Sequence, residues 1–177
     1  HLSTSFNTAF GESWNLDAYG DYIHKSGDYS RNIQENDESG MSEISFLQNG
    51  KWDIYALHAQ LSKTIKGGRE LSVGYDFSHT NGTDKLLYNT SIYNNSSHNK
   101  ETRNSFYVNY SFPVGLFSFN AGVRYERLSS KIRNDASANG NVYDAGHLLP
   151  SIGFNTYNKG VMQSFTYSVD TRSPEFS

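Results

Sequence analysis

The residues in this sequence that could perform chemistry are its histidines, serines and acids, as metal ligands or as a catalytic set. Six histidines are present, but none has paired spacing such as i and i+2 on one strand, where two side chains could hold one metal ion. No G-x-S-x-G or similar nucleophile motif occurs, and the stretch NDASANG lacks the spacing of a calcium loop. There is no cysteine, which excludes thiolate chemistry. We therefore expect no enzymatic activity, no metal site and no cofactor.

Aromatic side chains in long polar segments are the better candidates for function. Three such segments run over about residues 25–51, 79–103 and 128–147. Exposed aromatic rings on loops can grip a ligand, although long loops also fold back and bury some of their own aromatics. The candidate ligand-binding residues are Tyr29, Phe46, Tyr88, Tyr93 and Tyr143.

The elements between these segments alternate with period 2. The stretch FYVNYSFPVGLFSFNAGVRYER, residues 106–127, has an apolar residue at every second position on both sides of its Pro-Val-Gly. Such alternation predicts a β-hairpin with one apolar and one polar face. The same pattern recurs along the chain, without a helical period, and predicts about eight strands. Their apolar faces are marked by Phe6, Leu16, Leu57, Val73, Val108, Val123, Ile152 and Phe165.

Short and long connections alternate along this series of strands. Turn residues cluster at 11–13, 66–68, 113–115 and 158–160, and the three long polar segments fall between them. In a meander, alternate connections lie at opposite ends of the sheet, so the short turns gather at one end, as in outer-membrane barrels. We expect an all-β fold, an antiparallel up-and-down meander forming an outer-membrane-type barrel or a fragment of a larger one. Residues 1–177 would form a single β-barrel domain or barrel fragment.

The apolar face of these strands could contact lipid or a protein core. It carries almost no charge, whereas Asp76, Arg124 and Glu126 fall on the other face, and aromatics lie near both strand ends. A lipid-facing band flanked by aromatic girdles has these properties. We therefore predict that Arg124, Glu126 and Arg172 share one face with Asp76, opposite Tyr75, Phe117, Val123 and Tyr167. The net charge is −3, with no block of like charge, which argues against nucleic-acid binding.

Three segments resemble strands of a known family. FSFNAGVRYERLSS resembles the "aGlRyE" strand of TonB-dependent outer-membrane receptors, HLLPSIGFNTY resembles their "lfPslslsY" strand, and QSFTYSVDTRSPEF resembles their "lslsYsrrisRPsy" strand. Order and spacing agree over residues 117–176. Arg172 and Pro174 are retained, but Thr171 replaces the family's other arginine. These motifs record barrel architecture and no reaction.

The resemblance implies a role in uptake. Receptors of this family have a plug domain, a periplasmic coupling segment and about 22 strands, so we expect this chain to be part of a larger barrel that imports a scarce nutrient. It would lie in the bacterial outer membrane. Its expected partners are outer-membrane lipid, the TonB energy-coupling complex and an unidentified nutrient ligand. Two alternatives remain: a small structural or adhesive outer-membrane barrel without transport, and a soluble β-barrel that binds an apolar ligand.

Overall fold

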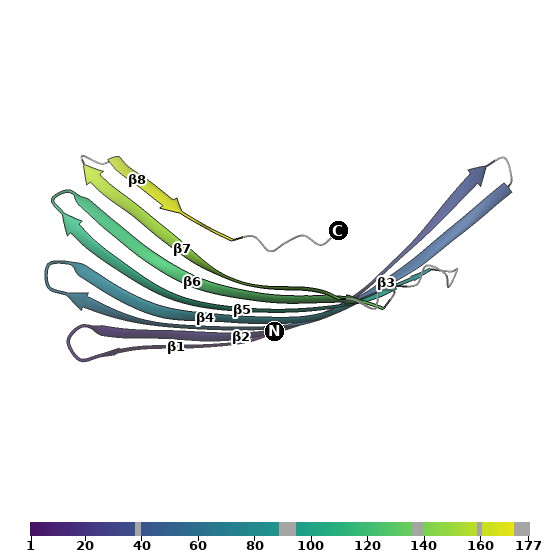
Figure 1. Cartoon of the computed structure of the whole chain (residues 1–177), viewed down its shortest axis with the longest axis horizontal. Coiled ribbons are helices and arrows are strands. Elements are labelled where there is room, and N and C mark those ends of the chain that lie inside the picture. The colour runs from purple at the N-terminus through teal and green to yellow at the C-terminus, as the bar shows by residue number, and fades with distance from the viewer. Residues whose placement is uncertain (38–39, 89–94, 136–139, 159–160, 172–177) are drawn as a thin grey trace.

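The protein is a single curved sheet (Figure 1). The computed structural model describes residues 1–37, 40–88, 95–135, 140–158 and 161–171. Eight antiparallel strands follow one another in chain order across the sheet, which confirms the predicted all-β meander. They are β1 (Leu2–Phe10), β2 (Trp14–Asp37), β3 (Gly40–Ile65), β4 (Arg69–Tyr88), β5 (Asn95–Val114), β6 (Phe117–Asn134), β7 (Asn141–Asn158) and β8 (Val161–Ser168).

The short turns gather at one end of the sheet, as expected (Figure 1). Gly11, Gly67 and Gly115 have φ values of 62°, 82° and 61°, in the left-handed region that glycine adopts at little cost. The turn expected at 113–115 lies slightly later in the chain, because β5 pairs with β6 as far as Val114. The turn expected at 158–160 lies partly outside the described residues.

In the described residues the long polar segments form strands, so the expectation of long loops there was wrong. β2 and β3 remain paired from Trp14–Lys63 to Asp37–Gly40, and β4 to β7 likewise continue through the polar stretches. Backbone pairing needs no apolar face when both sides of a hairpin meet water and the sheet below already fixes the register. The polar composition of these stretches reflects solvent on both faces.

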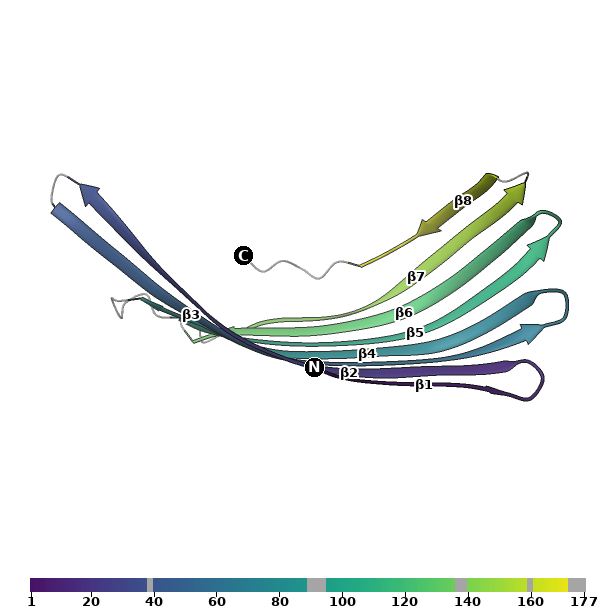
Figure 2. The same ribbon diagram turned by 180° about the vertical axis from the view of Figure 1, so that it is seen from behind.

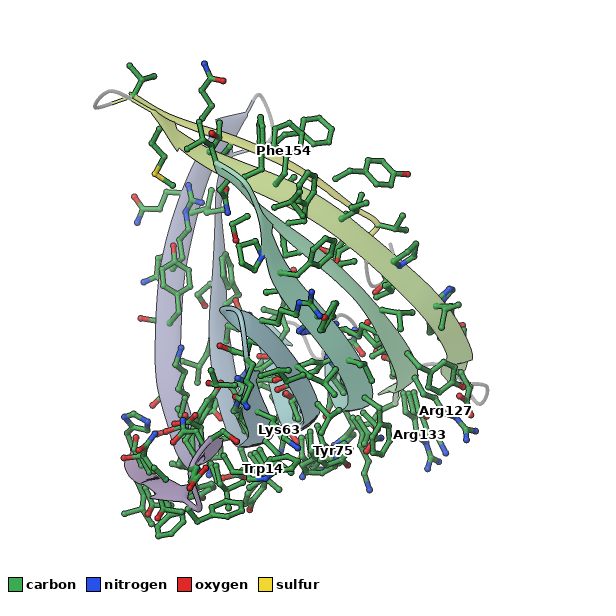
Figure 3. All side chains as sticks on the ribbon, turned by 90° about the vertical axis from the view of Figure 1, so that its left-hand side faces the viewer. Trp14, Lys63, Tyr75, Arg127, Arg133 and Phe154 are labelled. Carbon is green, nitrogen blue, oxygen red and sulfur yellow. The ribbon has the colours of Figure 1, made fainter. Side chains whose placement is uncertain are left out.

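One face of the sheet is apolar and exposed along its whole width. Leu2 is 70% exposed, Phe106 60% and Leu148 67%, and Phe117 and Val123 lie on the same face. Figure 3 shows Trp14, Lys63 and Tyr75 along this outer side of the curve. The exposed apolar face contradicts the alternative of a soluble barrel, which would have turned Tyr75, Phe117 and Val123 inward.

The other face is polar and crowded. A sheet one layer thick buries side chains where its curvature brings them together, and all of the least exposed residues lie on this concave face. They are Ser62, Ser72, Ser105, Tyr107, Glu126, Leu128, Ser130 and Leu149. The sheet itself therefore has a lipid-type outer surface and a polar inner surface, as outer-membrane barrels do.

The sheet does not close on itself. Among the described residues, β1 pairs with β2 and β8 pairs with β7, and the two strands form opposite margins (Figure 2). Beyond Tyr22 the outer edge of β2 has no neighbouring strand in the described part of the chain. The described residues contain no helix long and apolar enough to cross a membrane.

Candidate ligand-binding site

A polar network occupies the middle of the concave face. His58 Nδ1 lies 2.5 Å from Asp76 Oδ1, and Arg124 Nη2 lies 3.5 Å from Asp76 Oδ2. The Arg124 guanidinium sits over the Tyr107 ring, 5.3 Å from its centroid, and the Tyr107 hydroxyl donates to Gln60 Oε1 at 2.8 Å. Charges of opposite sign therefore meet across β4 and β6, and His58 links β3 to the same carboxylate. The predicted shared face of Asp76, Arg124 and Glu126 is confirmed.

Glu126 is the most enclosed acid of this face, at 3% exposure. Its carboxylate accepts hydrogen bonds from Ser105 Oγ at 3.3 Å and from Thr171 Oγ1 at 2.6 Å, and lies 3.8 Å from Arg103. Thr171 follows β8, so the chain beyond that strand passes over the inner face to reach β6. Arg172, which was predicted to share this face, lies outside the described residues. Among the described residues there is no group of three or more side chains suited to a metal ion.

Three of the predicted ligand-binding aromatics meet on the concave side of the protruding hairpins. The ring centroids of Tyr29 on β2 and Phe46 on β3 are 6.0 Å apart, and those of Phe46 and Tyr88 on β4 are also 6.0 Å apart. Tyr143 is not part of this row. It lies on β7, where its hydroxyl is 3.2 Å from His147 Nε2. Tyr93 lies outside the described residues.

An open hollow of about 690 Å³ lies next to this aromatic row. Tyr29 forms one side of it, and Trp52 of β3 forms another. A Cβ atom on Gly82 would come within 2.3 Å of the Trp52 ring, so the indole packs directly against the backbone of β4. Polar groups surround these rings. They are Lys25, Gln48 and Asp84.

The hollow exists because small residues face one another. Gly27 on β2 lies directly opposite Gly50 on β3, so two adjacent inward positions carry no side chain. One strand beyond Gly82, Asn99 faces the same side, and its Oδ1 is buried without a hydrogen-bond partner. An aromatic wall, a cation and a carboxylate suit a ligand with a flat or cyclic face and a polar rim. Trp52, Lys25 and Asp84 were not identified from the sequence. The glycines in these polar stretches, Gly27, Gly50 and Gly82, were the signal that could have indicated an open space there.

Charged pairs on the outer face mark where the apolar band ends. His24 donates to the Asp53 carboxylate at 2.9 Å, which lowers the pKa of Asp53. Arg127 holds Asp144 in a two-point ion pair, at 3.0 and 2.9 Å, which lowers the pKa of Asp144 and raises that of Arg127. These charges follow the aromatics Tyr22, Tyr55 and Tyr125, as expected just outside a lipid-facing band.

Comparison with known proteins agrees with this architecture. The family model described as "Outer membrane protein beta-barrel family" matches residues 3–177. The chain belongs to this outer membrane protein beta-barrel family. It therefore resides in the bacterial outer membrane, as predicted. None of the curated proteins matches the chain in sequence.

Solved structures with a similar fold include iron-uptake receptors and transporters. The open form of the ferric-catecholate import receptor Fiu from E. coli K12 has a TM-score of 0.75 at 11% identity, covering 97% of this chain and 35% of that one. The ferric citrate transporter FecA has a TM-score of 0.73 at 14% identity, covering 88% and 24%. The ferric yersiniabactin uptake receptor FyuA from Yersinia pestis has a TM-score of 0.55 at 12% identity, covering 87% and 24%. At these identities the likeness is one of fold, and the chain spans only about a quarter to a third of their length.

Proposed function

We propose that this chain forms part of the barrel wall of a TonB-dependent receptor that imports a scarce nutrient, without enzymatic activity. The observation that carries the proposal is the hollow beside Trp52 and Tyr29. It opens on the concave side of hairpins that extend beyond the apolar band, where a ligand arriving from outside would first meet the lumen wall. The TonB energy-coupling complex is the proposed source of energy in the full-length protein.

The shape of the sheet supports transport over a purely structural role. A closed eight-stranded barrel is filled by its own side chains, whereas wider barrels hold a lumen. Here β1 and β8 remain apart in the described residues, and the polar face between them carries side chains with solvent access, such as Arg124 at 44%. A wide, wet lumen is the arrangement that a receptor needs and that a small structural barrel lacks.

Uptake of defined iron chelates by whole cells tests the proposal. The probes are radiolabelled ferric citrate and a ferric catecholate, chosen because the structural neighbours carry these names. The full-length protein should raise uptake of a probe, and a protonophore should abolish that uptake. Trp52→Ala should reduce it by roughly 5- to 150-fold, if stacking on the indole contributes the roughly 1–3 kcal/mol found where a flat ring stacks on an aromatic side chain.

Trp14→Ala is the matched control, since Trp14 stacks on Phe10 on the outer face near the short turns. The Trp14→Ala variant should assemble in the outer membrane and import the probe normally. Uptake that is insensitive to the protonophore, or equal losses in the two tryptophan variants, would contradict energy-coupled import through this hollow. No uptake of either probe would favour the non-transporting barrel.

A further inference from the structure

Two cationic side chains face each other directly on the outer surface of the sheet. Lys100 on β5 is the register partner of Lys131 on β6, and two positions further out Arg133 lies opposite His98. Like charges directly opposite on neighbouring strands destabilise the sheet. An anion bound between the side chains would remove that repulsion. The arrangement therefore points to a negatively charged ligand.

The same residues surround a hollow of about 540 Å³. Lys100, Lys131 and Arg133 are exposed, and none of them forms an ion pair with another described residue. Asp135 is the acid that lines this hollow, and Lys85 on β4 adds a further cation beside it. We call Lys85, Lys100, Lys131 and Arg133 the outer basic patch. It concentrates positive charge in a chain whose net charge is −3, so composition does not explain it.

The outer basic patch stands above the lipid-facing band, on the same outer side of the sheet. Figure 3 shows Arg133 on the side that also carries Tyr75 and Trp14. On β5 and β6, Lys100 and Lys131 are each six positions beyond the last aromatics of the band, Phe106 and Tyr125. At ~3.3 Å per residue on a strand tilted by ~40°, this places the patch ~15 Å above that aromatic level.

That height distinguishes between membrane lipids. The headgroup zone of an ordinary phospholipid bilayer is only ~5–8 Å thick on each side. A glycolipid with phosphates on a sugar headgroup extends further from the acyl boundary. Lysine and arginine bind phosphate through charge-assisted hydrogen bonds. We propose that the outer basic patch binds phosphate groups on the sugar headgroup of an outer-leaflet glycolipid. This inference depends on the membrane location and does not depend on nutrient import.

Lipid titration of the full-length protein tests this inference. The protein is purified from outer membranes, delipidated in detergent and titrated with a bis-phosphorylated glycolipid or its enzymatically dephosphorylated form, with bound molecules counted by native mass spectrometry. The phosphorylated form should bind more tightly. Lys100→Glu combined with Lys131→Glu should weaken its binding roughly 25-fold, because each basic side chain near an anionic surface contributes about fivefold.

The control combines Lys66→Glu with Arg69→Glu, the same change in charge at the short-turn end of the sheet, and should leave binding unchanged. If the variant with Lys100→Glu and Lys131→Glu fails to assemble, Lys100→Gln with Lys131→Gln gives the same comparison without charge reversal. Equal binding of the two glycolipid forms, or equal effects in patch and control variants, would overturn the proposal. Competition by low millimolar inorganic phosphate would also overturn it, since that would indicate a small-anion site.

Discussion

Arg124 on β6 and Asp76 on β4 form an ion pair that spans the intervening strand, with Nη2 and Oδ2 3.5 Å apart. Tyr107 of β5 lies beneath the guanidinium and packs against Gly74, where a Cβ atom would come within 2.2 Å of the ring. Three strands are thus tied together on the inner face. The side chains remain open to water, with 44% of Arg124 and 31% of Asp76 exposed.

The exposure of this pair predicts a small energetic coupling. A double-mutant cycle with Asp76→Asn and Arg124→Gln should give a coupling free energy of no more than about 1 kcal/mol, as for other solvent-accessible ion pairs. The measurement is the free energy of unfolding by urea in lipid vesicles. A coupling several times larger would mean that the face is dry, as in a narrow closed barrel.

Glu126 provides the contrast on the same face. Because it is 3% exposed and accepts from Ser105 and Thr171, Glu126→Ala should cost about 1–3 kcal/mol by leaving these donors unpaired. The same urea unfolding measures this cost, and Glu126→Gln, which keeps an acceptor oxygen, should cost less. Equal costs for the two variants would show that the hydrogen bonds do not matter.

Two glycines near the hollow beside Trp52, Gly82 and Gly27, should respond differently to alanine. At Gly82 a Cβ atom would overlap the Trp52 ring at 2.3 Å, so Gly82→Ala must displace the indole. We expect a loss of about 1–3 kcal/mol in unfolding free energy, typical of overpacking. Gly27→Ala meets nothing within 4 Å and should be neutral or slightly stabilising. Thermal unfolding in detergent compares them, and similar melting temperatures would contradict the packing of Trp52 on β4.

The strands and their faces could be predicted from sequence because lipid imposes a strict rule. Val123 and Arg124 had to fall on opposite faces once period 2 was recognised, and the structure places them so. Lipid contact imposes no such alternation on the polar stretches. Between Lys25 and Lys51 both faces meet water, so nothing in the pattern distinguishes a paired strand from a loop.

The hollow beside Trp52 depends on strand register, which could not be predicted from the sequence. Tyr29, Phe46 and Tyr88 were chosen one by one as aromatics in polar stretches. They meet because β2, β3 and β4 stay paired to their tips, while the same pairing leaves Tyr143 several strands away. Trp52 was overlooked because it seemed to end a loop. The register shows that its ring covers Gly82 of β4 and that the neighbouring inward positions Gly27 and Gly50 face each other without side chains.

Acid should weaken the ion pair that joins β6 and β7 just beyond the apolar band. Arg127 lowers the pKa of Asp144 below its ordinary value of 3.8, so the pair stabilises the folded state above about pH 3.8 and the contribution is lost as pH falls through the lowered pKa. Arg127→Gln should therefore unfold at a lower temperature than the native protein at neutral pH. The difference should shrink below pH 3.8. A difference that is independent of pH would show that packing, not charge, accounts for the loss.

Arginine scanning of β6 tests which face contacts lipid. Val123 is 40% exposed on the outer face, in the middle of the apolar band, whereas Asn120 faces the lumen. Val123→Arg should cost about 2–4 kcal/mol, the usual penalty for arginine near the bilayer midplane. Asn120→Arg places the same side chain in water and should assemble normally. Heat-modifiable migration of outer-membrane fractions reports assembly, and equal yields of the two variants would overturn the assignment of the apolar face to lipid.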